Sequence, residues 1–257
     1  MTKLERLARI FGAPKIGLDS PLEDMLFLTE SDVTIETLPR LFKSEFMKLE
    51  LDGDGDWTFL AGMGLREHAD YDFALTDAVR PLHDLQFIPR AGFRHDKYTD
   101  DRTGEDTPLL MAAASREDLF DLFMDLLAPL GDEVDVFLRT SHENGNGHCD
   151  DLYREQIDLP ILKSILYDFE EMLLNDGNFG IAVTNLSVPV EVQLNEHKLL
   201  FIYSQDLNEF EKVLVDHKLE CDNELNFINE IEHVHFSSDE FARQFEELCY
   251  RLGLDKY

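Results

Sequence analysis

The sequence predicts an α+β fold, with mixed or mostly antiparallel sheets and helices packed on one face. Two observations lead to this prediction. Short apolar or alternating runs are separated by turn formers, as in VPVEVQL and KLLFIYS around NEH, and this pattern is typical of antiparallel hairpins. Other runs place apolar residues at helical spacing, which predicts amphipathic helices that bury one face against a sheet.

The N-terminal part of the chain contains a helical pattern and then a first group of strands. Met47, Leu49 and Leu51 alternate with charged residues, DGDGD follows, and WTFL resumes the apolar run, which predicts a β-hairpin. LLMAAAS is a short apolar strand, a helix begins after Ser115, and VDVFLRT is the next strand. The polar stretch RHDKYTDDRTGEDTP between these elements predicts an exposed loop.

The C-terminal part repeats this alternation of helices and strands. Pro160 to Asn175 predicts a helix, GIAVTNL a buried strand, and VPVEVQL with KLLFIYS a second hairpin. A helix carrying Leu207, Phe210 and Leu214 follows, then the strand IEHVHFS and a last helix that begins at Ser238.

We therefore expect an N-terminal helical segment (1–45), a first α+β half (46–142), a connecting loop (143–157) and a second half (158–257), or one compact domain overall. PLLMAAASREDLFDLFMDLL and KLLFIYSQDLNEFEKVLVDHKL share a double-Leu strand, a serine and similarly placed apolar helix residues. This similarity predicts an internal duplication.

The charge balance restricts the partners of the chain. It has 54 acidic and 23 basic residues, a formal net charge of −31. Such a chain repels phosphate backbones and anionic membranes, so we expect neither nucleic acid nor membrane as partner, whereas a basic protein would be attracted. Three widely spaced cysteines without a CxxC pair favour free thiols and a cytoplasmic location.

SHENGNGHCDD, residues 141–151, concentrates residue types that bind metals. His142, His148, Cys149 and Asp150 could supply zinc with imidazole, thiolate and carboxylate ligands. Its two Asn-Gly pairs equally suit a plain connector between folded halves, since they favour tight turns.

EHVHF is a second candidate metal site. In a strand, His233 and His235 point to one face, about 6–7 Å apart along it, and could form a two-histidine metal edge. The alternative is a solvated strand face, with Val234 and Phe236 in the core.

LDGDGDW is a weaker candidate. Asp52, Asp54 and Asp56 alternate like the first ligands of a calcium loop, but Trp57 and Met63 stand where that loop needs glycine and glutamate. A hairpin turn explains this segment better.

The leading functional prediction is non-catalytic binding of a protein partner through the acidic surface, of an immunity or regulatory type, without a cofactor. Neither a nucleophile elbow nor a nucleotide-binding loop is present, which argues against an enzyme. One alternative is a metal-dependent hydrolase that uses zinc or another divalent metal at 142–151 or 233–235. A second alternative is a small-ligand site in a cleft between the halves.

Overall fold

A computed structural model describes residues 73–81, 87–100, 104–142, 150–185 and 187–254, together with three two-residue strands nearer the N-terminus. Those strands are β1 (Leu28–Thr29), β2 (Glu50–Leu51) and β3 (Trp57–Thr58). Strands β2 and β3 pair antiparallel, as the hairpin around DGDGD predicts, while residues 52–56 lie outside the described residues.

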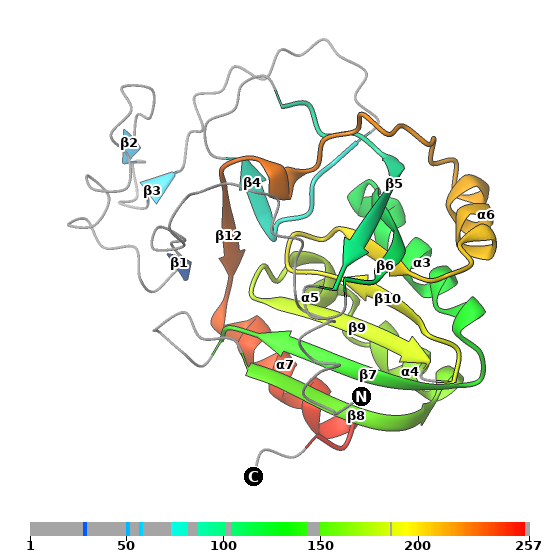
Figure 1. Cartoon of the computed structure of the whole chain (residues 1–257). Coiled ribbons are helices and arrows are strands. Elements are labelled where there is room, and N and C mark those ends of the chain that lie inside the picture. The colour runs from blue at the N-terminus through cyan, green and yellow to red at the C-terminus, as the bar shows by residue number, and fades with distance from the viewer. Residues whose placement is uncertain are drawn as a thin grey trace.

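The centre of the molecule is a seven-stranded antiparallel sheet of order β5-β6-β11-β10-β9-β7-β8 (Figure 1). Its strands are β5 (Gly92–Thr99), β6 (Asp106–Ala113), β7 (Glu133–Thr140), β8 (Asp150–Asp158), β9 (Phe179–Asn185), β10 (Val190–Leu194) and β11 (Leu200–Tyr203). Every neighbouring pair in this sheet runs antiparallel.

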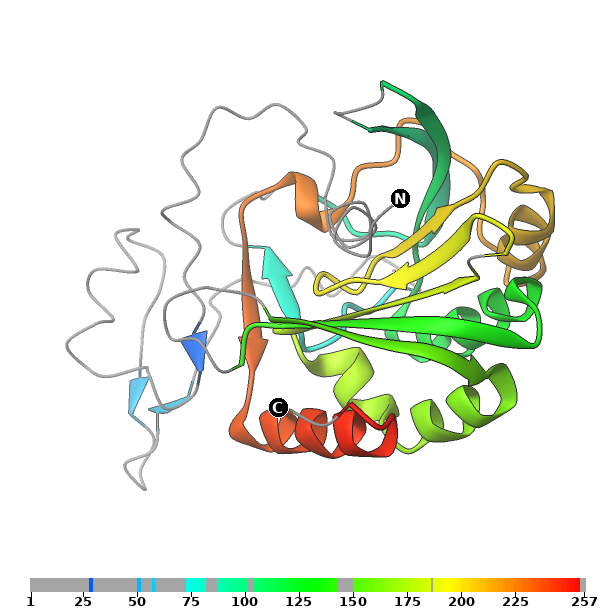
Figure 2. The same ribbon diagram turned by 60° about the horizontal axis from the view of Figure 1, so that its bottom comes forward.

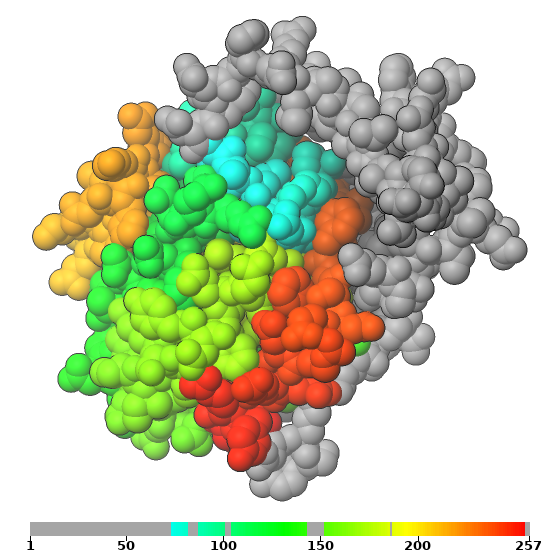
Figure 3. Space-filling view, turned by 180° about the vertical axis from the view of Figure 1, so that it is seen from behind, coloured from blue at the N-terminus to red at the C-terminus, as the bar shows by residue number. Residues whose placement is uncertain are grey.

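The helices in the described part of the chain pack on one face of this sheet (Figure 2), and the space-filling view from behind shows that side of the molecule (Figure 3). They are α3 (Arg116–Leu126), α4 (Leu159–Tyr167), α5 (Glu170–Asn175), α6 (Asn208–Asp216) and α7 (Asp239–Arg251). Two short 3₁₀ turns, η2 (Ala128–Leu130) and η3 (Ile228–Glu230), join them to the strands. The predicted α+β class, with helices on one face of an antiparallel sheet, is confirmed.

A smaller sheet stands beside one end of the large one. It has the order β1-β12-β4, with β12 (His233–Ser237) parallel to β1 and antiparallel to β4 (Val79–Pro81). Figure 1 shows β12 passing the end of the large sheet where β7 ends and β9 begins. This arrangement brings distant segments of the sequence together.

The alternation of side chains along the strands builds two hydrophobic layers. Leu110 and Ala112 of β6 face the helices, whereas Leu109, Met111 and Ala113 of the same strand face the opposite side. Because side chains of a strand alternate between faces, an almost fully apolar strand such as β6 must be covered on both sides. On the second side the cover comes from residues 73–79, Phe87 and residues 225–231.

The predicted exposed loop RHDKYTDDRTGEDTP is wrong for most of its length. Residues 94–99 belong to β5 and 106–108 to β6. The strand is polar because it is the edge of the sheet, where one side of the strand faces solvent. Arg94 anchors it from the inside, since its guanidinium lies 2.6 Å from Glu230 Oε1 and donates to the carbonyl of Leu225.

Two further elements differ from the expected boundaries. Residues 150–157 of the expected connecting loop lie in strand β8, where Tyr153 stacks on Phe137 of β7 with ring centroids 4.3 Å apart. The expected helix 160–175 is two helices, because Phe169 leaves helical geometry (φ −120°, ψ 17°) to bury its ring.

Strands from both expected halves lie in the one large sheet, since β6 pairs directly with β11 and β7 with β9. The internal duplication stays a prediction. Within the described part of the chain, no helix has the length and apolarity needed to cross a membrane.

Candidate metal site

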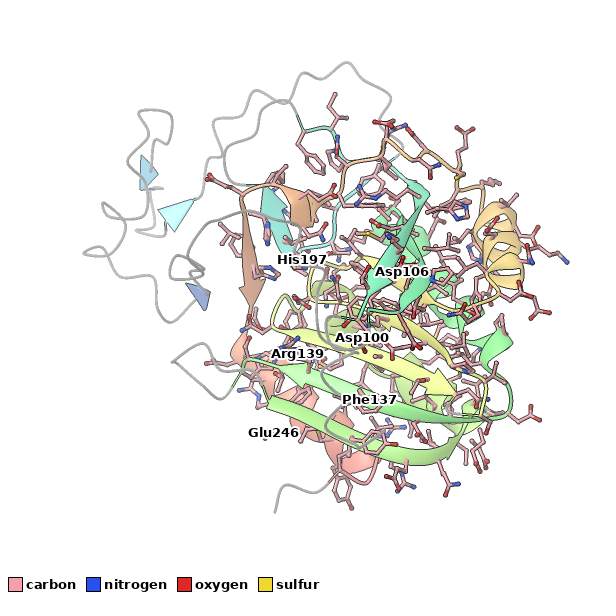
Figure 4. The ribbon with its side chains drawn as sticks, viewed as in Figure 1. Asp100, Asp106, Phe137, Arg139, His197 and Glu246 are labelled. Carbon is pink, nitrogen blue, oxygen red and sulfur yellow. The ribbon has the colours of Figure 1, made fainter. Side chains whose placement is uncertain are left out.

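Three histidines meet where β12 passes the turn between β10 and β11. His233 and His235 stand on β12, two residues apart and on the same face of the strand, as predicted. His197 lies in the turn 195–199 that joins the two strands of the large sheet (Figure 4). One potential ligand atom from each ring lies within 4.8 Å of those of the other two.

The rings pack edge to face against one another. Their centroids are 4.6 Å apart for His197 and His233, 4.7 Å for His197 and His235, and 5.0 Å for His233 and His235. Nε2 of His197 lies 2.9 Å from Nε2 of His233, a hydrogen-bond distance. We call these three residues the histidine cluster.

Backbone carbonyls fix the tautomers of the two strand histidines. Nδ1 of His233 lies 2.7 Å from the carbonyl of Ile231, and Nδ1 of His235 lies 2.8 Å from the carbonyl of Gly177. A carbonyl only accepts, so each Nδ1 carries a proton and donates it. The neutral rings therefore carry their lone pair on Nε2, the form in which histidine binds a metal.

Burial keeps two of the three rings uncharged at neutral pH. It lowers the pKa of His197 to about 3, with neighbouring His235 and His233 adding to the effect against the opposing charge of Glu196. It lowers the pKa of His235 to about 4, again against the charge of Glu196. Metal ions bind the neutral imidazole, so this environment favours ligation.

Gly177 makes the approach of β12 possible. Its N–H donates to the carbonyl of Phe236, whose own N–H donates to the carbonyl of Ala78. A Cβ at position 177 would lie 2.4 Å from the Ala78 oxygen and 2.8 Å from that of Phe236. Only glycine allows the backbones to come this close, and this contact places the carbonyl that orients His235.

The buried face of β12 is the opposite of the one that the sequence offered as the alternative. His235 is buried and Phe236 is 42% exposed, so the histidine face of the strand points inward. The alternative of a solvated histidine face with Phe236 in the core is therefore wrong. The reason is that the inner face of β12 packs on Gly177 and His197, at the end of the large sheet.

Asp176 forms a second polar cluster beside the first. It is fully buried, and its Oδ1 accepts from the hydroxyl of Ser237 at 2.7 Å and from the N–H of Asn178 at 3.0 Å. Its Oδ2 lies 2.6 Å from Nε2 of His142. We call Asp176 and His142 the anchor pair, because together they hold the end of β7 and, through Ser237, the end of β12.

Lys198 is a buried cation between the two clusters. Its ammonium donates to the carbonyl of Phe179 at 2.9 Å. Burial lowers the pKa of Lys198 to about 8, against the nearby charges of Asp176 and Glu196, which raise it. Nearby carboxylates thus offset part of the cost of burying this amine.

Glu196 precedes His197 in the sequence and is the carboxylate that forms an ion-pair contact with the cluster. Its Oε1 lies 3.7 Å from Nδ1 of His197, and its side chain is 39% exposed. Burial raises the pKa of Glu196, but His197, a backbone hydrogen bond, His235 and Arg139 together lower it by more, so the pKa lies below its ordinary value. Figure 4 labels Arg139 on β7, below His197.

The structure brings together some of the predicted metal ligands and separates others. His233 and His235 come together, and His142 does not join them, because Asp176 holds its ring. Asp150 begins β8 opposite Thr140 in the backbone register, while His148 and Cys149 lie outside the described residues. His142 still reaches the strand of EHVHF indirectly, through Asp176 and Ser237.

His197 is the candidate site residue that sequence reasoning missed. It sits in NEH, at the tip of a correctly predicted hairpin, where a polar residue needs no special explanation. The usable signal was weak: a histidine at a hairpin tip, next to an acidic residue.

A small pocket borders the cluster at His197. His197 and Lys198 contribute to its wall, and most of the remaining lining is apolar: Phe73, Leu75, Phe87, Pro89, Ala113, Ala114, Leu119, Leu199, Phe227 and Ile228. The small-ligand site in a cleft between the halves stays a prediction.

Comparison with known proteins adds no relative, since no family model, curated protein or solved structure matches the chain.

Proposed function

We propose that this protein binds a divalent transition-metal ion of the zinc class through His197, His233 and His235. The observation that carries the proposal is the convergence of three imidazoles with ligand atoms within 4.8 Å of one another. Imidazole nitrogen suits zinc, copper, iron and nickel, and three histidines are an established ligand set for zinc.

The geometry supports a metal after small ring movements. In a tetrahedral zinc site with Zn–N bonds of about 2.0–2.1 Å, the ligand nitrogens lie about 3.3 Å apart. The 2.9 Å between the Nε2 atoms of His197 and His233 is slightly less than this spacing. Rotation of the His197 ring would open it, while the two strand rings are already held by backbone carbonyls.

Binding of Co²⁺ to the metal-free full-length protein tests this proposal, because cobalt bound by imidazoles absorbs visible light. We expect one equivalent to bind, zinc to displace it, and substitution of His197, His233 or His235 by Ala to abolish it. His95 and His217 are matched controls, since each lies near a carboxylate away from the cluster, and their Ala variants should bind normally. Absence of binding, or binding that survives all three cluster substitutions, would refute the proposal.

Recognition of a basic protein through the acidic surface is a second proposal. The outer face of α3 supports it, because its exposed residues Glu117, Asp118, Asp121 and Asp125 are all acidic. Such a field speeds association with a basic partner in a salt-dependent way. A captured partner whose association rate did not fall with added salt would count against this role.

A further inference from the structure

His197 in the metal-free protein carries its proton on the wrong nitrogen for metal binding. Asn195 Oδ1 accepts from the backbone N–H groups of His197 and Leu199, at 3.1 and 3.0 Å. The amide nitrogen of Asn195 is therefore the atom that lies 3.2 Å from Nδ1 of His197, and it donates to that nitrogen. The ring proton then sits on Nε2, from which it is donated to His233.

A metal at Nε2 requires the opposite tautomer. The lone pair must be on Nε2, so the proton must be on Nδ1, where it needs an acceptor. The amide nitrogen of Asn195 cannot accept. Glu196 Oε1 is 3.7 Å from the same nitrogen and can accept after a movement of less than about 1 Å, given ordinary hydrogen-bond lengths.

We propose that Glu196 is the positioning residue of the metal site. Its carboxylate accepts a hydrogen bond from Nδ1–H of His197 when Nε2 binds the ion. This inference rests on the proposed metal binding. Glu196 then sets the affinity of the histidine cluster for the ion without touching the ion. Carboxylate–histidine–metal arrangements of this kind fix ring orientation and raise ligand basicity.

The placement of Glu196 suits this role. It lies in the same turn as His197, and Asn195 fixes that turn through its two backbone hydrogen bonds. The exposed fraction of its side chain, 39%, leaves room for the short movement. The two strand histidines need no such partner, because carbonyls already accept their Nδ1 protons.

The experiment compares the affinity for Co²⁺ and for Zn²⁺ of the full-length protein and its Glu196→Ala and Glu196→Gln variants. Loss of an outer-shell partner weakens metal binding about 10–100-fold, which we expect for Glu196→Ala. Glu196→Gln should fall between it and the natural protein, because its amide oxygen accepts a hydrogen bond without a charge. Glu232→Ala and Glu232→Gln are the matched controls, since Glu232 is exposed and adjoins His233 in sequence.

Two readouts separate positioning from other roles. The visible spectrum of bound Co²⁺ should keep its band positions in the Glu196 variants, and the thermal stability of the metal-free variants should stay unchanged. A changed spectrum would make Glu196 a direct ligand and overturn the proposal, as would affinities equal to those of the Glu232 controls. Failure of the natural protein to bind metal would instead refute the proposed function itself.

Discussion

The histidine cluster and the anchor pair lie side by side at one end of the large sheet, yet they use histidine in opposite ways. In the anchor pair, Nε2 of His142 is 2.6 Å from a buried carboxylate, so the nitrogen that could bind a metal is already engaged. In the cluster, Nδ1–H of His233 and of His235 donates to a backbone carbonyl, which leaves Nε2 of these two rings for a ligand. The hydrogen-bond partner of the ring, more than the presence of histidine, separates a structural role from a ligand role.

The test with the largest expected effect removes the carboxylate of the anchor pair. Asp176→Ala takes the acceptor from His142, Ser237 and the N–H of Asn178 at once. Breaking such a buried arrangement leaves polar groups without partners, and we expect a loss of about 3–5 kcal/mol in the free energy of unfolding.

Denaturant unfolding of the metal-free protein measures this loss. Asp168→Ala is the matched control, because Asp168 pairs with Arg251 at 2.6 Å on the surface and should cost at most about 1 kcal/mol. Equal losses in the two variants would show that Asp176 is not the anchor that its contacts indicate.

A smaller effect separates the two histidine roles directly. His142→Ala should lower the free energy of unfolding by about 2–3 kcal/mol, with or without zinc, because a buried charged hydrogen bond is lost. His197→Ala should instead lose the stabilisation by zinc, which in the natural protein is about 2.7 kcal/mol at a concentration a hundred times Kd.

Unfolding measured with zinc and with a chelator gives both numbers for each variant. We expect His142→Ala to be less stable both with zinc and with the chelator, and His197→Ala to have the same stability in both conditions. If His142→Ala also abolished the zinc effect, the anchor pair would belong to the metal site.

Periodicity along a strand was enough to predict two of the three residues of the histidine cluster. His233 and His235 alternate with Val234, so their common face follows from strand geometry alone. His197 could not be predicted, because its approach to β12 depends on where that strand packs. Strand β12 pairs with β4 and β1, which are distant in sequence, and not with the hairpin whose tip it meets.

Local composition gave a wrong prediction where the position of a segment in the sheet determines its structure. The polar segment 94–99 forms a strand because it is the sheet edge, and its contacts with Glu230 and Leu225 come from a segment more than 100 residues away. SHENGNGHCDD misled through its residue types. Of its predicted ligands, only His142 has a described side chain, and that side chain is held by Asp176.

The smallest test uses the pH dependence of stability in the metal-free protein. Burial lowers the pKa of His197 to about 3 and that of His235 to about 4, below the value of about 6.5 in an unfolded chain. Between pH 6 and 4 the unfolded chain binds protons that the folded protein refuses. Stability must therefore fall as the pH falls, by about 1.4 kcal/mol per pH unit for each such histidine.

His235→Asn removes one of these two groups, so the slope of unfolding free energy against pH should decrease by up to about 1.4 kcal/mol per pH unit, and by less near pH 4, where the folded ring begins to accept a proton. Carboxylates far from His235 contribute equally to both proteins, so the difference reports the histidine and its neighbour Glu196. Chemical unfolding in the presence of a chelator, from pH 7 to 4, gives the two slopes. Identical slopes would mean that the ring of His235 accepts a proton in the folded state, and would remove the electrostatic distinction between the histidine cluster and an ordinary solvated histidine.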